Sequence, residues 1–367
     1  MADRIHVTYE ITASDAQAGL IAEAISREQT VELPPGAYPE HIEREIVGRI
    51  EAQTASRNGR SRVEVSYDAR IVGADLAQLL NLVCGNVSLL EGVRVVDLAL
   101  PAELTSVLGG PRLGIAGLRK VTGTHRRPLL VGAMKPVGLT ARELANLGAQ
   151  FARGGMDIIK DDHGLADQPW APFRERVARC SEAIAAAAEQ SGTTTLYAPN
   201  ITGPSDSLLE RVAWAVDCGC PAVMVSPLLQ GLDAVRLARD AGVAVLAHPT
   251  MSGAVFSEGR GIAPHVLYGT LLPAAGCDGV IFTVAGGRFP VSRETSLAVA
   301  RRIGGPRTAG EPALPILGGG IDVADVPSWI DRLGTEIGFL VGSSLYASGN
   351  IERAVRNLVA TVEHSVG

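Results

Sequence analysis

The chain has 367 residues, 46% of them hydrophobic, and a formal net charge of −6. This apolar content suffices for a sizeable core, whereas no block of Lys and Arg is long enough to follow a nucleic-acid backbone. Residues 1–15 lack a basic start followed by an apolar run, and no later apolar run reaches the roughly 18 residues of a membrane span. We therefore expect a globular cytoplasmic protein with neither nucleic acid nor membrane as a partner.

Residues 1–110 have the pattern of a small α+β domain. Alternating apolar and polar residues predict strands, and apolar residues at helical spacing predict helices. The predicted strands cover residues 4–11 and 60–72, and the predicted helices cover residues 15–30 and 74–85. Elements in this order favour an antiparallel sheet. The glycine-rich stretch 107–120 marks the joint, so a second domain is expected over residues 111–367.

The second domain contains eight short apolar runs, each followed by a helical stretch. The runs cover residues 129–136, 156–162, 195–202, 222–229, 243–250, 279–287, 314–320 and 337–344. Continuous apolar strands covered by helices are typical of a parallel sheet, and eight such units close into a (β/α)8 barrel, an α/β fold. An open doubly wound sheet is the alternative, but it has fewer units and a glycine-rich dinucleotide loop after its first strand, unlike "AMKPVGLT" at 133–140.

In such a barrel the active site lies at the C-terminal ends of the strands. Few polar or glycine residues interrupt the apolar runs there. They are Lys135, Lys160, Asp162, His163, Asn200, His248, Arg288, Gly318, Gly319, Gly320, Gly342 and Ser343. Residues two apart on a strand share a face, so Lys160 and Asp162 can both face the barrel mouth while Asp161 faces away.

Lys160 stands out because lysine is rare in this chain. Only three of the 33 basic residues are lysine, at positions 120, 135 and 160. A guanidinium stays protonated in proteins, whereas an amine can become neutral through burial and then act as a base or nucleophile. Lys135 and Lys160 are therefore candidates for amine chemistry. For Lys160, a structural ion pair with a neighbouring aspartate is the alternative.

The glycines that end the last two strands predict an anion site. The backbone N–H groups of "LGGG" (317–320) and "VGSS" (341–344) can approach a phosphate, as is common in barrels. Glycines required for tight packing are the alternative. His248, at the end of the fifth strand, is either a proton-handling or substrate-contacting residue or a buried core histidine.

Several motifs together resemble the large subunit of ribulose bisphosphate carboxylase. In chain order they are "ISREQT" (25–30), "CGNVSLL" (84–90), "GPRLGIAGLR" (110–119), "AMKPVGLT" (133–140), "GGMDIIKDD" (154–162), "QPWAPFRER" (168–176) and "PNIT" (199–202). The resemblance thus extends over most of the chain. We expect no counterpart of the C-terminal extension of the carboxylases.

The resemblance implies roles for individual residues. Lys160 would take up CO2 as a carbamate, and the carbamate with Asp162 would bind Mg2+, a cation that prefers oxygen ligands. Lys135 would be the general base that removes the substrate proton. Glu28 and Asn86 would be contributed by a neighbouring subunit, which implies a homodimer with its active sites at the subunit interface.

The third metal ligand departs from the carboxylase pattern. Carboxylases have a glutamate where this chain has His163. A neutral imidazole suits Mn2+ or Co2+ better than Mg2+. We therefore expect the ligand set Lys160, Asp162 and His163, with Mg2+ or one of these two ions bound.

The substrate-binding positions also depart from the carboxylase pattern. His248 is kept as a catalytic histidine, but Pro249 replaces an arginine that grips one phosphate, and Ser252 replaces a second histidine. Arg288 stands where a lysine holds the carboxylate derived from CO2, and Phe282 replaces another histidine. A bisphosphate substrate and carboxylation are therefore not expected. The pattern resembles the non-carboxylating branch of the family, whose members act on monophosphates.

The expected activity is metal-dependent enolisation of a phosphorylated keto sugar, with isomerisation of 5-methylthioribulose 1-phosphate in methionine salvage as the first choice. The alternatives within the branch are 2,3-diketo-5-methylthiopentyl-1-phosphate enolase and 3-oxo-isoapionate 4-phosphate decarboxylase. All three activities share an enolate. A catalytically silent binding or regulatory protein is the alternative from another class.

Overall fold

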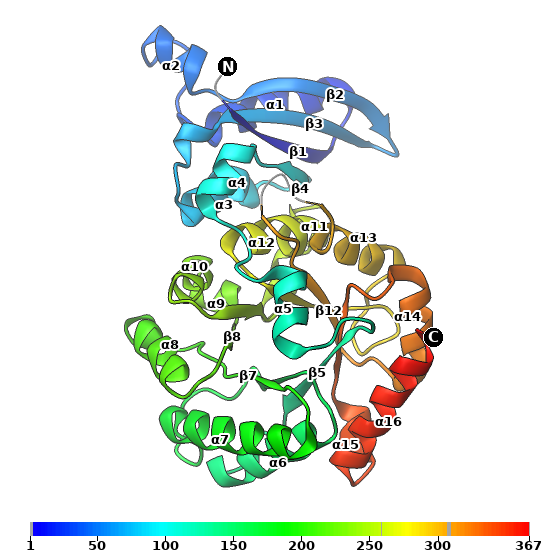
Figure 1. The fold of residues 1–367 in the computed structure, drawn as a ribbon. Coiled ribbons are helices and arrows are strands. Elements are labelled where there is room, and N and C mark those ends of the chain that lie inside the picture. Colours follow the sequence, from blue (N-terminus) through cyan, green and yellow to red (C-terminus); the bar gives the residue numbers. More distant parts are fainter. Residues whose placement is uncertain (1–2, 258, 307–309, 367) are drawn as a thin grey trace.

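The computed structural model describes residues 3–257, 259–306 and 310–366. Figure 1 shows a small N-terminal sheet at one end of a barrel whose strands are surrounded by helices. The predicted fold class, a (β/α)8 barrel preceded by a small α+β part with an antiparallel sheet, is confirmed. The domain boundary between residues 110 and 111 stays a prediction.

The N-terminal sheet has the strand order β10-β4-β1-β3-β2. Its strands are β1 (Arg4–Thr12), β2 (Arg49–Arg57), β3 (Arg60–Asp68), β4 (Val93–Ala99) and β10 (Gly261–Ile262), and the helices of this part are α1 (Asp15–Glu28), α2 (Glu40–Glu45), α3 (Leu76–Cys84) and α4 (Ala102–Leu108). Every second residue of β1 from Ile5 to Ile11 is buried, in one hydrophobic cluster with residues of α1 and α3. The alternating pattern in the sequence is thus the buried face of this sheet.

Two features of this sheet differ from the sequence expectation. The strand predicted over 60–72 ends at Asp68, because the Asp68 side chain accepts a hydrogen bond from the Arg70 backbone and starts the 3-10 turn Ala69–Ile71. The sheet also contains β2 and β4, which were not predicted. The two-residue β10, which follows the fifth barrel strand in the chain, pairs parallel with β4 and so joins the barrel to the N-terminal sheet.

The barrel sheet has the strand order β7-β6-β5-β13-β12-β11-β9-β8. Its strands are β5 (Leu129–Met134), β6 (Ile158–Asp161), β7 (Leu196–Ala198), β8 (Ala222–Val225), β9 (Ala244–Ala247), β11 (Gly279–Thr283), β12 (Leu314–Gly318) and β13 (Gly338–Val341). A parallel bridge between Asn200 and Met224 links β7 to β8 and closes the ring. All pairs within this sheet are parallel, as expected for strands joined by helices.

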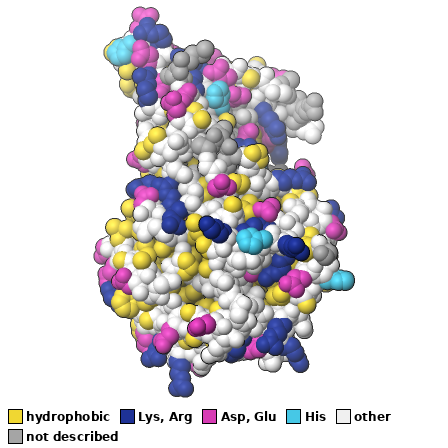
Figure 2. All heavy atoms as spheres, in the orientation of Figure 1, with side chains coloured by type: hydrophobic (Ala, Val, Ile, Leu, Met, Phe, Trp, Pro, Cys, Tyr) yellow, Lys and Arg dark blue, Asp and Glu magenta, His cyan; other side chains and the backbone are white. Residues whose placement is uncertain are grey.

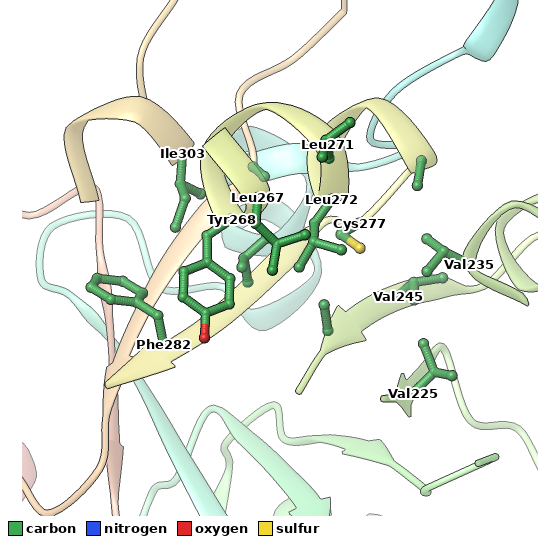
Figure 3. Close-up of a cluster of buried hydrophobic side chains, with 14 of the residues drawn as sticks. Val225, Val235, Val245, Leu267, Tyr268, Leu271, Leu272, Cys277, Phe282 and Ile303 are labelled. Carbon is green, nitrogen blue, oxygen red and sulfur yellow. The ribbon is translucent and has the colours of Figure 1, made fainter. Parts of the chain in front are cut away.

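The barrel helices follow the strands around the outside (Figure 1). They are α6 (Ala141–Arg153), α7 (Phe173–Ser191), α8 (Leu208–Asp217), α9 (Pro227–Gln230), α10 (Asp233–Asp240), α11 (Pro264–Val266), α12 (Leu272–Ala275), α13 (Arg293–Ile303), α14 (Val326–Leu333), α15 (Ser343–Ala347) and α16 (Ile351–His364). A π-helical turn, Leu267–Leu271, joins α11 to α12. Figure 3 shows side chains of this turn packed with residues from β9 and β11.

The N-terminal end of the barrel is closed by α5 (Gly114–Thr122). Ile115 and Leu118 of α5 are buried in the same cluster as Leu129 and Leu314, the first residues of two strands. Asp278, just before β11, accepts hydrogen bonds from the backbone of Leu113 and Gly114 at the start of α5 and from Val245 on β9. One end of the barrel is therefore sealed, and any site must open at the other.

On the face drawn in Figure 2, the basic and acidic side chains of the described residues are interspersed. They form no large patch of one charge on this face. None of the helices in the described ranges combines the length and the apolar character that a membrane span requires.

Candidate active site

A cavity of about 1010 Å³ opens at the C-terminal ends of the barrel strands. Most of the residues proposed from sequence line it. They are Lys135, Lys160, Asp162, His163, His248, Arg288, Gly319, Gly320, Gly342 and Ser343. Gly318 lies below the cavity within β12, and Glu28 and Asn86 lie on the N-terminal part of the chain. The alternation rule for strand side chains thus correctly places Lys160 and Asp162 on the cavity side.

Lys160 is carried by β6 and is 1% exposed. Burial lowers the pKa of its amine to about 8, against the attraction of the nearby Asp162 carboxylate. Its Nζ donates a hydrogen bond to the backbone oxygen of Asp161 at 2.9 Å. A larger fraction of neutral amine is therefore available near neutral pH than for an exposed lysine, which is the condition for carbamate formation.

The structural ion pair in this region is formed by Asp161 instead. Its carboxylate points away from the cavity and lies 3.1 Å from Arg176 Nε, in a pair with no exposed side-chain surface. Tyr197 Oη and the backbone N–H of Asn200 also donate to this carboxylate. The charge of Arg176 is therefore balanced by Asp161.

Asn200 has a structural role, like Asp161. It is fully buried, and its side-chain amide donates to the backbone oxygens of His163 and Leu165. These bonds hold the loop that follows β6. Asn200 thus fixes the position of His163 without lining the cavity itself.

Asp162 is the centre of a small polar cluster. Its Oδ1 lies 3.3 Å from Lys135 Nζ and 3.4 Å from His163 Nδ1. Burial opposes ionisation of this carboxyl, but the hydrogen bond from His163 and the charges of Lys135 and Lys160 outweigh burial and hold its pKa well below the usual range. Asp162 is therefore a carboxylate at any physiological pH.

Two histidines stack on each other beside this carboxylate. The rings of His163 and His248 are nearly parallel, with centroids 4.6 Å apart. His248 Nδ1 lies 2.7 Å from Thr250 Oγ1, and burial together with the charge of Lys160 lowers the pKa of His248 far below its ordinary value. His248 is therefore neutral in the folded chain, which makes it a hydrogen-bonding residue of the cavity and not a source of positive charge.

A divalent cation fits this cluster if Lys160 contributes to it. Within the part of the chain that the structure describes, His, Cys, Asp and Glu side chains alone form no group of three that could hold a metal. Asp162 and His163 would supply one oxygen and one nitrogen ligand, and Lys135 Nζ and His163 Nδ1 lie 3.3 Å and 3.4 Å from Asp162 Oδ1. A carbamate on Lys160 would add the missing oxygen ligand, which is the donor set that the sequence predicts.

The glycines at the ends of β12 and β13 have different reasons to be glycine. Gly319 and Gly320 have φ angles of +89° and +112°, which disfavour a side chain, and a Cβ on Gly319 would lie 3.0 Å from Thr283 Cγ2. A Cβ on Gly342 would meet nothing within 4 Å. Conformation thus explains the first two glycines, whereas at Gly342 the absence of a side chain leaves the backbone open to the cavity.

Arg288 lies next to these glycines. Its backbone N–H donates to the Gly319 oxygen at 2.8 Å, and its guanidinium lies 5.7 Å from the centre of the Phe289 ring. The backbone bond places this loop beside the end of β12. A cationic side chain and glycine backbone therefore share one side of the cavity, as a phosphate site requires.

An aromatic wall, formed by Phe256, Tyr268 and Phe282, was not predicted from the sequence. The rings of Phe256 and Tyr268 meet edge to face at 5.2 Å, and the Tyr268 and Phe282 centroids lie 6.4 Å apart (Figure 3). Met251 and Phe289 line the same cavity and are about half exposed. In the sequence these residues look like ordinary core positions. The only indication of this wall in the sequence is Phe282, which stands where carboxylases have a histidine.

Hydrogen bonding within the wall is already satisfied. Ser252 Oγ donates to the Pro249 oxygen at 2.6 Å, so its contact with Tyr268 Oη at 2.5 Å uses the tyrosine proton. Burial raises the pKa of Tyr268 to about 12, so this hydroxyl keeps its proton. The wall therefore offers a ligand apolar rings and one acceptor oxygen, which is a poor environment for a phosphate.

The chain is similar in sequence to several known proteins. A sequence profile of the ribulose bisphosphate carboxylase large chain, catalytic domain, matches residues 114–298. A ribulose bisphosphate carboxylase-like protein 1 of Rhodopseudomonas palustris is 38% identical over 99% of each chain. The chain belongs to the ribulose bisphosphate carboxylase large-chain family. The predicted family is thus confirmed, in its RuBisCO-like form.

Other members of the RuBisCO-like group are also similar. A 5-methylthioribulose-1-phosphate isomerase of Rhodospirillum rubrum is 36% identical and aligns over 94% of this chain and 92% of its own length. A 2,3-diketo-5-methylthiopentyl-1-phosphate enolase of Geobacillus kaustophilus is 35% identical over 78% of this chain and 71% of its own. The crystal structure of a Rubisco-like protein from Rhodopseudomonas palustris superimposes with a TM-score of 0.89 and 35% identity, over 99% of this chain and 98% of that one.

Proposed function

We propose that this RuBisCO-like chain enolises a phosphorylated keto sugar, and that its reaction is the isomerisation of 5-methylthioribulose 1-phosphate. The observation that carries the proposal is the amine of Lys135, 3.3 Å from the Asp162 carboxylate, in a cavity that also contains the buried amine of Lys160. Lys135 would remove the proton from the carbon next to the carbonyl. Return of this proton to the former carbonyl carbon, with transfer of the hydroxyl proton to the former carbonyl oxygen, completes an isomerisation with no other reactant.

The residues around Lys135 support this role. A divalent cation held by carbamylated Lys160, Asp162 and His163 would, when bound, polarise the substrate carbonyl. It would also bind the Asp162 carboxylate, which in the structure lies 3.3 Å from Lys135 Nζ. His248, neutral and held by Thr250, would hydrogen-bond the substrate.

The residues that line the cavity support a monophosphate with an apolar end. Arg288, the glycine backbones at 319, 320 and 342, and Ser343 would bind one phosphate. The aromatic wall offers neither a cation nor a free donor to a second phosphate, but it suits a thioether group. The Rhodospirillum rubrum relative is named for a substrate of this kind.

A second copy of the chain is part of the proposal. Asn86 donates a hydrogen bond to Glu28 at 2.9 Å, so the two residues form one unit on the N-terminal part of the chain. Neither lines the cavity of the same chain. In a homodimer this unit would close the cavity of the partner and exclude water from the reaction.

The enolase activity is the second candidate, because several relatives at 31–35% identity bear the name 2,3-diketo-5-methylthiopentyl-1-phosphate enolase. That reaction also begins with proton removal next to a carbonyl. The two activities therefore differ in substrate and product and not in the proposed base.

A substrate panel distinguishes the candidates. The protein, incubated with Mg2+ and bicarbonate, is given 5-methylthioribulose 1-phosphate, 2,3-diketo-5-methylthiopentyl 1-phosphate and ribulose 1,5-bisphosphate, and products are followed by 31P NMR. We expect turnover of the first monophosphate, none of the bisphosphate, and loss of turnover in a folded Lys160→Arg variant, since a guanidinium forms no carbamate. Turnover of the diketo compound alone would assign the enolase activity. Turnover of the bisphosphate alone, or wild-type activity in the variant, would contradict the proposal.

A further inference from the structure

Tyr346 forms an unusual bridge at the edge of the cavity. Its hydroxyl donates a hydrogen bond to the backbone oxygen of Ala133 at 2.8 Å and accepts one from the backbone N–H of Lys135 at 2.8 Å. Tyr346 lies on α15, directly after β13, and it lines the cavity. A single side-chain atom therefore holds both backbone groups next to the amine proposed as the base.

The position of these bonds in the sheet explains what they do. β5 and β13 pair in parallel up to Gly132 and Val341, after which the chain leaves β13 for α15. The oxygen of Ala133 and the N–H of Lys135 point to the same edge of β5, because backbone groups two residues apart share a side of a strand. The Tyr346 hydroxyl thus replaces the next peptide group of β13 and extends the ladder to Lys135.

The Tyr346 ring is itself fixed in place. It packs edge to face against Phe151 of α6, with centroids 6.0 Å apart and planes at 71°. Burial raises the pKa of the Tyr346 hydroxyl, so it keeps the proton that it donates to Ala133. The bridge therefore joins three separately packed elements, namely β5, α6 and α15.

We infer that Tyr346 is a positioning residue that holds the backbone of Lys135 where its amine reaches both Asp162 and the substrate carbon. The role of Lys135 as the base rests on the proposed function. The two hydrogen bonds of Tyr346 do not depend on it. Lys135 follows the last residue of β5, so its backbone N–H bonds to the Tyr346 hydroxyl and not to a neighbouring strand. A shift of about 1 Å in a reacting group lowers rates by up to roughly a hundredfold.

The first arm of the test is independent of activity. Because the chain contains only three lysines, [15N,13Cε]lysine labelling gives three backbone and three side-chain NMR signals. In Tyr346→Phe, which keeps the ring, we expect the Lys135 amide to exchange with solvent at least about tenfold faster and both Lys135 signals to move, while the Lys120 signals stay in place. Unchanged Lys135 signals in the folded variant would overturn the inference, whatever the enzyme proves to do.

The second arm measures catalysis in the same variant. We expect kcat for the keto sugar phosphate to fall about tenfold or more, KM to change less than about threefold, and the kinetic isotope effect with substrate deuterated next to the carbonyl to rise, because proton removal becomes slower. A higher KM with unchanged kcat would instead show that Tyr346 contacts the substrate, and would overturn the positioning role. If the wild type turns over no substrate, the proposed function fails, and the NMR arm alone decides the inference.

Thr195→Val is the matched control. Thr195 Oγ1 donates to the backbone oxygen of Met156 at 2.8 Å and joins two strand starts at the far end of the barrel. This variant also loses a hydroxyl bonded to strand backbone, but far from Lys135. We expect unchanged kcat, isotope effect and Lys135 signals. If Thr195→Val reproduced the changes seen in Tyr346→Phe, general loosening of the barrel would explain both, and the inference would be wrong.

Discussion

Burial gives the Lys160 amine its chemical character. The side chain is 1% exposed at the end of a strand whose neighbours are apolar, and burial lowers its pKa to about 8. The folded chain therefore holds this proton less tightly than the unfolded chain does, and the amine becomes neutral as the pH rises through about 8. A buried amine of this kind can react with CO2, which an exposed lysine with its higher pKa does to a much smaller extent.

We predict that carbamate formation on Lys160 follows this titration. Burial lowers the pKa of this amine to about 8, so its neutral fraction rises between pH 7 and pH 9. With 13C-labelled bicarbonate, a carbamate signal in the 13C NMR spectrum should grow over this range at constant dissolved CO2, and Lys160→Arg should give none. A signal that is flat from pH 7 to 9, or that persists in the variant, would rule out this site.

The imidazole of His163 should set the metal preference. Imidazole suits Mn2+ and Co2+ better than Mg2+, whereas a carboxylate suits Mg2+. We expect isothermal titration calorimetry to show that the carbamylated wild type binds Mn2+ at least about tenfold more tightly than Mg2+. The ratio of the two affinities should be smaller for His163→Glu. Equal ratios in the two proteins would mean that His163 is not a ligand.

At the scale of elements, Asp278 joins α5, the helix that closes the N-terminal end of the barrel, to strand β9. Its carboxylate is buried, burial raises its pKa, and it accepts backbone hydrogen bonds from Leu113, Gly114 and Val245. These bonds fix the start of α5 against β9 and β11. This role cannot be predicted from the sequence, because the partners are more than 30 residues away in the chain.

Removal of this carboxylate should destabilise the protein. In Asp278→Ala two buried N–H groups and one partly buried N–H group lose their acceptor, so we expect the free energy of unfolding to fall by about 2–4 kcal/mol. Urea denaturation followed by circular dichroism measures the change. Asp206→Ala, at an exposed position of a 3-10 turn, is the control, with an expected change below about 0.5 kcal/mol. A loss below about 1 kcal/mol in Asp278→Ala would contradict this role for the carboxylate.

A comparison of the strands shows which parts of the fold can be predicted from the sequence. The eight barrel strands were predictable because each is a continuous apolar run covered by helices, and the alternation of β6 placed Lys160 and Asp162 in the cavity. β2 was missed because its sequence, RIEAQTASR, has no apolar face. β10 was missed because two residues that pair with a distant strand leave no local pattern.

The aromatic wall and the Tyr346 bridge were missed for a related reason. Tyr268 and Phe282 are buried residues in apolar segments, and a sequence does not tell which buried aromatic ring also borders a cavity. The Tyr346 hydroxyl bonds to backbone more than 200 residues away. Such contacts depend on the closed barrel, and no spacing in the chain predicts them.

At the scale of the whole molecule, each cavity lacks the Glu28–Asn86 unit of its own chain. The unit lies on the N-terminal part, linked by a 2.9 Å hydrogen bond, and the cavity lies at the C-terminal ends of the barrel strands. A second copy can supply it, as the family resemblance implies. Every complete site would then contain a barrel from one chain and Glu28 with Asn86 from the other.

Mixed dimers test this arrangement. Lys160→Arg and Asn86→Ala should each be inactive alone. After unfolding and refolding in equal amounts, half of the dimers are mixed, and each mixed dimer has one intact site, so about a quarter of the wild-type activity should return. No recovery in mixed dimers that are verified by mass spectrometry, or a fully active monomer in light scattering, would contradict the shared site.

The central claim is that Lys135 removes a proton next to the substrate carbonyl, and exchange with solvent tests it most directly. In D2O with a divalent cation and bicarbonate, 1H NMR should show deuterium entering 5-methylthioribulose 1-phosphate at the carbon next to its carbonyl, whatever the final product. Exchange should stop when the metal is chelated, and it should fall at least about a hundredfold in Lys135→Met. Absence of exchange with every phosphorylated keto sugar and every metal, or undiminished exchange in Lys135→Met, would contradict the account.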